Sequence, residues 1–348
     1  MKTILLTGGL GFIGSHTCIS VILKNYNILI FDSLINSEIN NLQAIEKICN
    51  LSNKLQKARI TFIKGDIKDK ELLVNTFERA FIKGSPIEAV IHFAGLKSVK
   101  ESLEKPLSYW ETNVYGSINL LEAMRKFDCK KIIFSSSATI YKPTLNKLVK
   151  ENFELGPINP YGNTKLAVEN ILRDLVKDKL NDWRIINLRY FNPVGAHTSG
   201  LLGENPKGKP NNLFPILLKV ASGEYDKLSI FGNDWPTRDG TCIRDYIHVM
   251  DLAEAHLAAL DFINDSGPTL LNLNIGTGSG KSVLEVVETF KKINKCNFKY
   301  VFEPRRKGDV PFLVANNTLA LSKLKWYPKK DVSDMCRDAW KWKINSKD

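Results

Sequence analysis

The stretch Thr7-Gly8-Gly9-Leu10-Gly11-Phe12-Ile13-Gly14 decides the fold of this chain. It follows the apolar run Lys2–Thr7, which is typical of a buried strand, and it opens a segment predicted to be a helix. In such a unit the first glycine permits a tight turn, the second lets the backbone approach a phosphate, and the third lets helix and strand pack closely. The helix N-terminus adds free N–H groups and a partial positive charge. The stretch therefore predicts a dinucleotide-binding turn.

Apolar runs and helical patterns alternate outward from this turn. Further strands are predicted at Asn27–Phe31, Arg59–Lys64, Glu88–Phe93, Lys131–Ser135 and Arg184–Arg189. Apolar residues at helical spacing occur at Glu71–Phe81, Gly116–Phe127 and Leu166–Leu180. Strands without polar alternation are buried on both faces, and strand–helix repetition implies right-handed crossovers. We therefore expect an α/β fold with a Rossmann-type doubly wound parallel sheet.

A second, smaller domain is predicted after Pro193, where glycine- and proline-rich loops interrupt short helical segments. A predicted strand and amphipathic helix over Asp245–Phe262 suggest that the chain then returns to the first domain. The expected division is a first domain at 1–192, with a return at about 241–277, and a smaller C-terminal α/β substrate domain at 193–240 and 278–348.

Composition excludes several classes of protein. With 348 residues, 43% hydrophobic and 25% charged, the chain is neither disordered nor a coiled coil. The net charge is +12, but the lysines are scattered, so a nucleic-acid partner is not expected. The 6 cysteines form no metal or redox motif, and no apolar run is long enough to span a membrane. We expect free thiols, no metal, no membrane partner and a cytoplasmic location.

Acidic residues at two strand ends indicate which cofactor binds. Asp32 ends the second predicted strand, where a carboxylate accepts hydrogen bonds from the adenosine ribose. Because a carboxylate repels a 2′-phosphate, NAD is favoured over NADP. Asp66 follows the next strand and is a candidate for the adenine side or, equally, for the N-cap of the following helix.

Tyr161 and Lys165 lie one turn apart on a predicted helix, after a strand that ends in Ser135-Ser136-Ser137-Ala138-Thr139. A Tyr–Lys pair at this spacing also arises by chance on helix surfaces. The residue types fit oxidation of an alcohol, in which a phenol removes the proton as hydride leaves. A nearby ammonium, together with the nicotinium of NAD, lowers the pKa of the phenol. Ser137 would hydrogen-bond the same substrate oxygen.

These motifs together resemble the extended short-chain dehydrogenases/reductases. Later blocks narrow the resemblance to UDP-glucose 4-epimerases; they are His92–Ser98, Leu188–His197, Ile230–Asp234, Arg244–Leu252 and Pro304–Asp309. The resemblance covers essentially the whole chain. It implies an isomerase of galactose metabolism that interconverts UDP-galactose and UDP-glucose by transient oxidation at sugar C4. Its NAD is tightly held, and Tyr161, Lys165 and Ser137 are the catalytic residues.

The resemblance also implies binding residues in both domains. The NAD positions are Gly8, Gly11, Phe12, Ile13, Gly14, Asp32, Asn36, Ser37, Asp66, Ile67, Phe93, Ala94, Gly95, Lys97, Asn113, Ser135, Tyr161, Lys165 and Tyr190. The UDP-sugar positions are Ser137, Tyr161, Asn192, Asn212, Leu213, Phe231, Arg244, Arg306, Asp309 and Leu313. The two arginines would contact the pyrophosphate, Phe231 the uracil side and Asp309 the uridine ribose.

The resemblance also suggests a homodimer through the helices that follow Asn113 and Tyr161.

Three alternatives for the function stay open at this point. Leu313 is intermediate between the bulky residues that exclude N-acetyl sugars and the small ones that admit them, so UDP-N-acetylglucosamine and UDP-N-acetylgalactosamine are possible substrates. A 4,6-dehydratase would need an Asp-Glu pair where this chain has Ser136-Ser137-Ala138. A catalytically silent NAD-sensing protein is the third alternative, since a fold alone does not prove chemistry.

Overall fold

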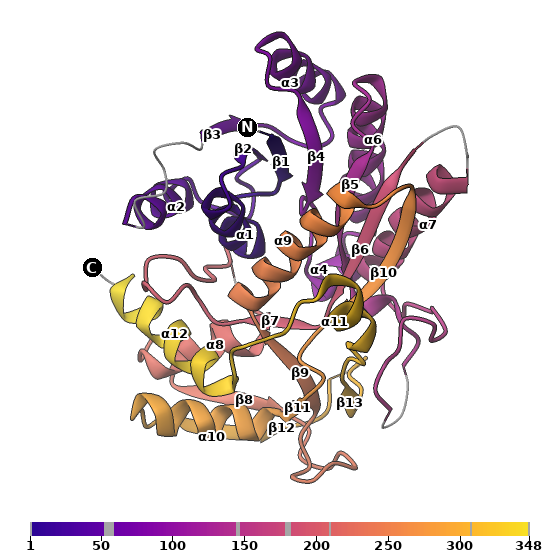
Figure 1. Cartoon of the computed structure of the whole chain (residues 1–348). Helices are drawn as coiled ribbons and strands as arrows, with labels where there is room; N and C mark the ends of the chain where they lie inside the picture. The colour runs from indigo at the N-terminus through magenta and orange to yellow at the C-terminus, as the bar shows by residue number, and fades with distance from the viewer. Residues whose placement is uncertain are drawn as a thin grey trace. The chain divides into compact units, whose positions relative to one another are not determined.

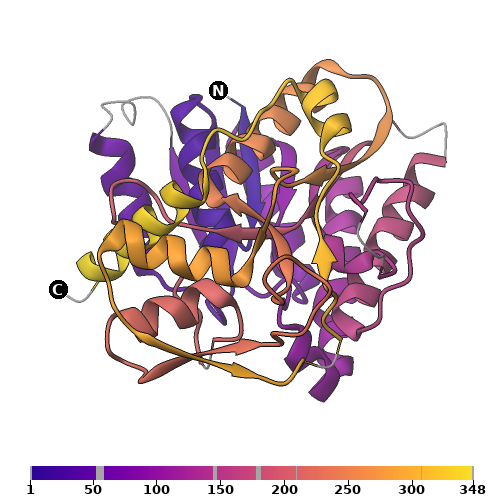
Figure 2. The ribbon, with the colours of Figure 1, turned by 90° about the horizontal axis from the view of Figure 1, so that it is seen from below.

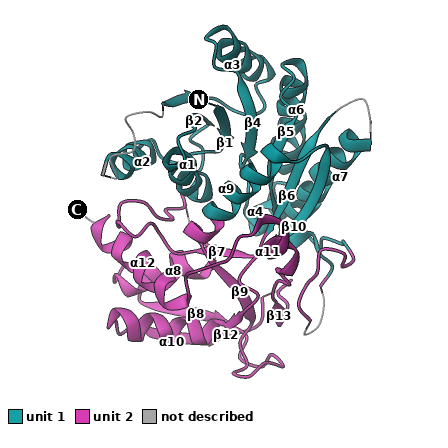
Figure 3. Cartoon of the chain, viewed as in Figure 1, with its two compact units in different colours: residues 1–142, 155–189, 253–273 teal, residues 143–154, 190–252, 274–348 magenta. Residues whose placement is uncertain are grey.

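The computed structural model describes residues 2–51, 59–143, 147–177, 182–208, 210–306 and 308–346. The chain forms two compact units, coloured separately in Figure 3. Unit 1 comprises Met1–Lys142, Leu155–Arg189 and Ala253–Leu273. Unit 2 comprises Pro143–Glu154, Tyr190–Leu252 and Asn274–Asp348. The chain therefore crosses between the units several times.

Unit 1 is built on a seven-stranded sheet in the order β10-β6-β5-β4-β1-β2-β3 (Figure 1). Its strands are β1 (Thr3–Thr7), β2 (Asn27–Asp32), β3 (Ile60–Lys64), β4 (Ile87–His92), β5 (Lys131–Ser137), β6 (Arg184–Tyr190) and β10 (Thr269–Ile275). The pairs β1–β2, β2–β3, β1–β4 and β4–β5 are parallel. Strand order reverses between β1 and β4, which is the topological switch point where such sheets bind ligands. The predicted doubly wound α/β fold is confirmed.

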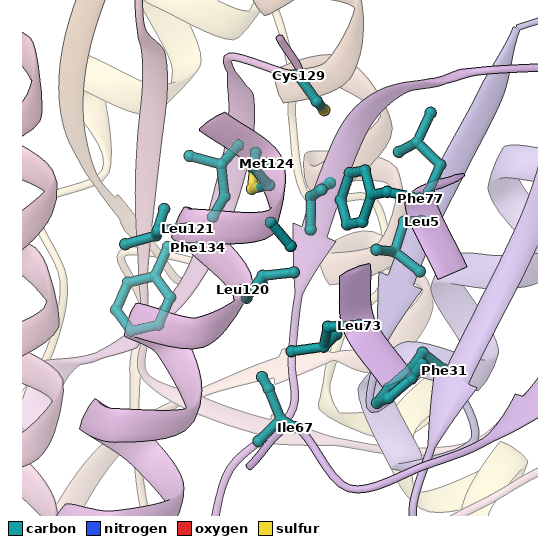
Figure 4. Close-up of a cluster of buried hydrophobic side chains, with 14 of the residues drawn as sticks. Leu5, Phe31, Ile67, Leu73, Phe77, Leu120, Leu121, Met124, Cys129 and Phe134 are labelled. Carbon is teal, nitrogen blue, oxygen red and sulfur yellow. The ribbon is translucent and has the colours of Figure 1, made fainter. Parts of the chain in front are cut away.

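Helices cover both faces of this sheet. The cluster in Figure 4 joins α3 (Lys70–Ile82), α6 (Gly116–Lys126) and α7 (Pro160–Lys177) to the strands through buried side chains that include Leu5, Phe31, Leu73, Phe77, Leu120 and Phe134. The other face carries α1 (Phe12–Leu23), α2 (Asn40–Leu51) and α9 (Val249–Asp265) (Figure 1). Ser20 of α1 donates a hydrogen bond to Glu254 of α9 at 3.0 Å, which ties these two helices together.

The N-cap of α3 is Asp69, whose side chain accepts a hydrogen bond from Leu72 N at 2.9 Å. The alternative role predicted for Asp66, as the N-cap of this helix, is therefore wrong. Asp66 lies one turn earlier, and its carboxylate accepts from Lys68 N at 2.9 Å. Its backbone oxygen accepts from Asp69 N, so Asp66 shapes the turn that leads into the helix.

Short elements follow β4 and β5. After β4 come α4 (Val99–Glu104), α5 (Pro106–Tyr109) and the π-helix η1 (Trp110–Tyr115), which runs directly into α6. After β5 comes the 3₁₀ helix η2 (Ala138–Ile140). Single π-turns often occur at functional sites because the wider turn shifts a side chain out of helical register.

Unit 2 contains smaller sheets and four helices among its described residues. The strands are β7 (Asn192–Val194), β8 (Lys227–Phe231), β9 (Ile243–His248), β11 (Gly280–Ser282), β12 (Lys299–Glu303) and β13 (Phe312–Leu313). The helices are α8 (Leu213–Ala221), α10 (Val283–Asn294), α11 (Thr318–Leu324) and α12 (Val332–Asn345). Helices α10 and α12 lie side by side in both views (Figures 1 and 2), where Phe290 and Trp340 meet edge to face at 5.8 Å.

No helix among the described residues combines the length and the apolar character needed to cross a membrane.

Candidate active site

The glycine turn after β1 is shaped by backbone crowding at two of its three motif glycines. Gly8 has φ +67°, and a Cβ there would lie 2.7 Å from Ala94 N. A Cβ at Gly14 would lie 2.4 Å from the Gly8 oxygen. At Gly11, by contrast, a Cβ would meet only the Gly8 oxygen within 4 Å among the described residues, at 3.2 Å. Packing therefore explains Gly8 and Gly14, whereas Gly11 leaves its outer side open.

The N-terminus of α1 follows directly. Its N-cap is Gly11, which provides no side-chain hydrogen bond, and its first turn contains no acidic residue. The amides of this turn are thus available to an anion, and the helix dipole favours a negative charge there. A bare glycine with an uncapped helix end fits the pyrophosphate of NAD.

Asp32 braces this turn from the end of β2. The buried carboxylate accepts from Leu10 N through Oδ2 at 2.9 Å, and through Oδ1 from Leu34 N at 2.9 Å and from Ser37 Oγ at 2.7 Å. Two predicted NAD residues, Asp32 and Ser37, are thus in direct contact. Asn36, which lies between Asp32 and Ser37 in the sequence, has an exposed side chain.

Asn113, on the π-helix, connects the loop after β4 to the helix that carries Tyr161. Its Oδ1 accepts from Leu96 N at 2.7 Å, and its Nδ2 donates to Leu96 O at 3.1 Å and to Thr164 Oγ1 at 3.0 Å. A Cβ at Gly95 would lie 3.0 Å from Asn113 Oδ1. The loop that holds the predicted NAD residues Phe93, Ala94, Gly95 and Lys97 is therefore fixed against Asn113.

His92 is buried beneath this loop and stays neutral. Its Nδ1 lies 2.7 Å from Thr7 Oγ1 and its Nε2 lies 2.8 Å from Ser117 Oγ. Burial, and to a lesser degree the nearby Lys165 ammonium, lower the pKa of His92 to about 3. A neutral imidazole with both ring nitrogens engaged joins β1 to α6 and has a structural role.

Lys165 extends from α7, and its ammonium reaches the carboxyl end of β5. Its Nζ donates to Ser135 O at 2.7 Å and stands 4.8 Å from the centre of the Phe134 ring and 6.0 Å from that of Tyr161. Burial lowers the pKa of Lys165 to about 8, while Glu169 acts in the opposite direction. The backbone oxygen and the ring faces stabilise the ammonium in this buried position.

Ser137 lies near the Tyr161 hydroxyl and affects its pKa. Ser137 Oγ accepts from Thr139 N at 3.2 Å and from Thr139 Oγ1 at 3.0 Å. Because a hydroxyl has two acceptor positions and one proton, Ser137 keeps its own proton to donate. A donor at the phenol oxygen stabilises its ionised form, and Ser137 in this way lowers the pKa of Tyr161.

Burial nevertheless has the larger effect and raises the pKa of Tyr161 above its ordinary value. The lowering expected from Lys165 together with the nicotinium of NAD stays a prediction. When bound, oxidised NAD supplies a hydride acceptor and a further positive charge beside this hydroxyl.

Thr139 was missed by sequence reasoning. It follows Ser137 by two residues and forms an ST-type turn, which the run Ser135-Ser136-Ser137-Ala138-Thr139 already contained as a signal. Its contribution is to orient the Ser137 hydroxyl, as described above.

In unit 2 the predicted UDP-sugar residues form two pairs. Arg244 Nη1 donates to Val310 O at 2.7 Å, and Nη2 lies 3.4 Å from Asp309 Oδ1. Leu313 lies opposite Arg244 in the β13–β9 register. The second pair is Arg306 and Phe231, with the guanidinium carbon 4.0 Å from the ring centre.

Arg306 also reaches the start of α8, where its Nη1 donates to Asn211 O at 3.4 Å. Asn212 is the N-cap of that helix and makes no side-chain cap hydrogen bond. Asn192 Oδ1 is buried without a hydrogen-bond partner among the described residues. An unpartnered acceptor, an uncapped helix end and two arginines fit an anionic, hydrogen-bonding ligand.

The remaining predicted residues are placed as follows. Ile67 packs on α6, where a Cβ at Gly116 would lie 2.5 Å from Ile67 Cγ2. Tyr190 ends β6 and is buried. Within the part of the chain that the structure describes, no cluster of three or more His, Cys, Asp or Glu side chains could hold a metal ion.

The fold defines the class: an NAD-binding Rossmann domain of the extended short-chain dehydrogenase/reductase type, in which Tyr161, Lys165 and Ser137 are the predicted active-site groups. Residues 5–339 match the family model described as GDP-mannose 4,6 dehydratase, and the chain belongs to that family. Within it, the UDP-glucose 4-epimerase of Bacillus subtilis (strain 168) is 46% identical over 344 residues, which cover 99% of this chain and 97% of that protein.

Solved structures show the same likeness. The UDP-glucose-4-epimerase of Stenotrophomonas maltophila with bound NAD and formylated UDP-arabinopyranose has a TM-score of 0.93 and 41% identity, covering 100% of this chain and 99% of that one. The UDP-glucose 4-epimerase of Bifidobacterium longum in complex with NAD+ and UDP has a TM-score of 0.90 and 41% identity, covering 99% of each chain.

Proposed function

We propose that this protein is a UDP-glucose 4-epimerase that interconverts UDP-galactose and UDP-glucose with tightly bound NAD. The observation that carries the proposal is the buried Lys165 ammonium, which donates to Ser135 O at 2.7 Å and lies 6.0 Å from the centre of the Tyr161 ring, in a chain 46% identical to a UDP-glucose 4-epimerase over nearly its whole length. Tyr161 removes the proton of the C4 hydroxyl while hydride leaves C4, and it returns that proton when hydride is added to the other face. Ser137 holds the reacting oxygen, and Lys165 stabilises the phenolate.

We assign NAD to the predicted residues of unit 1 and the UDP group of the substrate to those of unit 2. The glycine turn, Asp32 and the Asn113 loop would hold the cofactor in place. Arg244 and Arg306 suit the pyrophosphate because guanidinium binds phosphate in a bidentate manner. This division gives the nucleotide several charged contacts and leaves the sugar few, which allows a 4-keto sugar to turn over between the two hydride transfers.

A 4,6-dehydratase activity is disfavoured, although the family description names one. That reaction needs an acid pair beside the site of hydride transfer, and this chain has Ser136-Ser137-Ala138 there. These residues are instead engaged with α7 and with Thr139. An epimerase is the better fit to the residues present.

The test is incubation of the purified protein with UDP-galactose and, separately, with UDP-N-acetylgalactosamine, without added NAD. We expect UDP-glucose from the first tube, resolved by chromatography. Conversion in the second tube as well would mean that Leu313 leaves room for an N-acetyl group. Failure of both, even after NAD is supplied, would refute the proposal and leave the NAD-sensing alternative.

We also propose that the protein is a cytoplasmic homodimer. Apolar side chains of α5 and η1 are exposed, with Leu107 82%, Trp110 42% and Tyr115 51% accessible, and a second copy would cover them. All six cysteines are free, as expected in a reducing compartment. Light scattering at micromolar concentration should give twice the chain mass of 39.3 kDa; a monomer would contradict the dimer.

A further inference from the structure

Helix α7 and strand β5 meet in unit 1 along three successive polar contacts. The helix contributes residues one turn apart and the strand contributes three adjacent serines; the pairs are Tyr161 with Ser137, Lys165 with Ser135, and Glu169 with Ser136. The first two contacts hold the proposed catalytic groups. The third lies one turn farther along the helix and is the only one of the three made by a carboxylate.

Glu169 uses both of its oxygens in this contact. Ser136 Oγ donates to Oε1 at 2.5 Å, Arg189 Nε donates to the same oxygen at 3.0 Å, and Arg189 Nη2 donates to Oε2 at 2.7 Å. Arg189, on β6, also donates to Tyr141 Oη at 2.8 Å. Because β5 and β6 are neighbours in the sheet, one carboxylate fastens the helix to two adjacent strands.

The ion pair is deeply buried, since the Arg189 and Glu169 side chains are only 2% and 1% exposed. Lys165, one turn away on α7, is also buried, so Glu169 lies near two buried cations. Removal of its carboxylate would take a negative charge away from both of them. An ammonium responds to such a change by losing its proton, whereas a guanidinium does not. Glu169 therefore favours the protonated form of Lys165.

Among the described residues, the titratable groups placed against the Lys165 ammonium include Tyr161 on the same helix and His92 on β4, which is neutral. Two further contacts on β5 are uncharged, namely Ser135 O and the Phe134 ring. Glu169 is the carboxylate that raises the pKa of Lys165 against the lowering by burial.

We propose that Glu169 is a positioning residue for the reaction at C4: it anchors α7 to β5 and, as the counter-charge to Lys165, keeps the ammonium protonated beside Tyr161. The inference rests on the proposed function for its catalytic consequence. The effect of Glu169 on the protonation of Lys165 involves only residues of unit 1 and can be tested without substrate.

The experiment compares the wild-type protein with Glu169→Gln. Lysine side-chain NMR, with the Lys165 signal assigned through Lys165→Met, should show the Lys165 titration moved to lower pH by about one unit. In the epimerase assay kcat should fall about tenfold with KM for UDP-galactose within about twofold. In the pH profile of kcat, the alkaline limb should move to lower pH together with the Lys165 titration, because the enzyme loses activity once Lys165 is neutral.

Further variants distinguish an effect of Glu169 on Lys165 from an effect on the stability of the protein. Glu169→Asp keeps the charge and should titrate near the wild-type value. Glu169→Gln with Arg189→Met removes both charges of the ion pair, so it remains informative if the single variant does not fold, and it should still show the lowered Lys165 titration. The matched control is Glu254→Gln, which removes another glutamate that accepts from a serine, Ser20, at 3.0 Å in the same unit. It should leave both readouts unchanged.

An unchanged Lys165 titration in Glu169→Gln and in the double variant would overturn the inference, as would an equal shift in Glu254→Gln. Absence of epimerase activity in the wild-type protein would refute the proposed function instead, and the NMR titration would still decide the role of Glu169.

Discussion

Replacement of Tyr161 by Phe should lower kcat by about 100- to 10,000-fold, the usual contribution of a positioned acid or base. The change removes one oxygen, the phenol oxygen whose pKa Ser137 lowers. The rest of the ring keeps its edge-to-face contact with Tyr109, at 6.5 Å between centres, so the fold should be retained. Calorimetric titration should find NAD and UDP affinities within about twofold of the wild type, since a loss confined to the transition state lowers kcat alone.

Tyr109→Phe is the matched control for this prediction. Its hydroxyl donates to Ser98 O at 2.7 Å and to Glu101 Oε2 at 3.2 Å, away from Ser137 and Lys165. Loss of these hydrogen bonds should cost stability, on the order of 1 kcal/mol, with kcat nearly unchanged. If Tyr161→Phe weakened binding as much as turnover, or lowered kcat no more than Tyr109→Phe, the role of Tyr161 would be structural.

The second large effect is expected at the glycine turn, where Gly14→Ala and Gly11→Ala should differ in kind. A Cβ at Gly14 would lie 2.4 Å from the Gly8 oxygen and 2.8 Å from Gly9 Cα, and backbone atoms cannot move aside cheaply. Gly14→Ala should therefore lower the free energy of unfolding by about 1–3 kcal/mol and weaken NAD binding at least about tenfold.

Gly11→Ala should leave the fold intact, because Gly11 has φ −68° and ψ 172° and, among the described residues, a Cβ there meets one atom within 4 Å, at 3.2 Å. Its stability in urea should stay within about 0.5 kcal/mol of the wild type, while NAD affinity falls about tenfold or more as the methyl group occupies the phosphate side. Gly267→Ala, at an exposed position with nothing within 4 Å, should change neither property. Undiminished NAD affinity in Gly11→Ala would contradict the assignment of this turn to the pyrophosphate.

Sequence patterns predicted six of the seven strands in the sheet of unit 1, and five of them (β1, β2, β4, β5 and β6) are buried and read as continuous apolar runs. Strand β10 was missed; its first four residues are only partly buried. The run predicted at Lys131–Ser135 was two residues short, since β5 continues to Ser137. Serines weaken an apolar signal, yet the Ser136 hydroxyl donates to Glu169 and the Ser135 backbone oxygen accepts from Lys165, both on α7. A hydrophobic pattern fails at a strand end whose residues make polar contacts with a neighbouring helix.

The sequence does not show which residues far apart in the chain contact one another in the fold. Glu169 and Arg189 lie on a helix and a later strand, and nothing in their spacing indicates that they form a buried ion pair. The π-helix at Trp110–Tyr115 is likewise set by tertiary packing, in which Asn113 contacts Leu96 and Thr164. The raised pKa of Tyr161 depends on burial, which a motif cannot measure.

Asp66 and Asp69 show that residue preferences alone do not decide which residue is the N-cap of a helix. Both are residues that favour an N-cap, and both lie just before a predicted helix. The choice of Asp69 follows from the turn in which Asp69 N donates to Asp66 O, at 2.9 Å, because this turn places the start of α3 after Asp69.

The central claim is that one hydrogen leaves C4 of the sugar and returns to the same carbon from the protein's own bound cofactor. The most direct test is conversion of UDP-galactose carrying deuterium at C4 in ordinary water, without added NAD, followed by mass spectrometry and NMR of the UDP-glucose formed. The account predicts that the product retains the deuterium at C4, because Tyr161 exchanges only the hydroxyl proton with solvent. Product with hydrogen from water at C4, or no product at all, would contradict it.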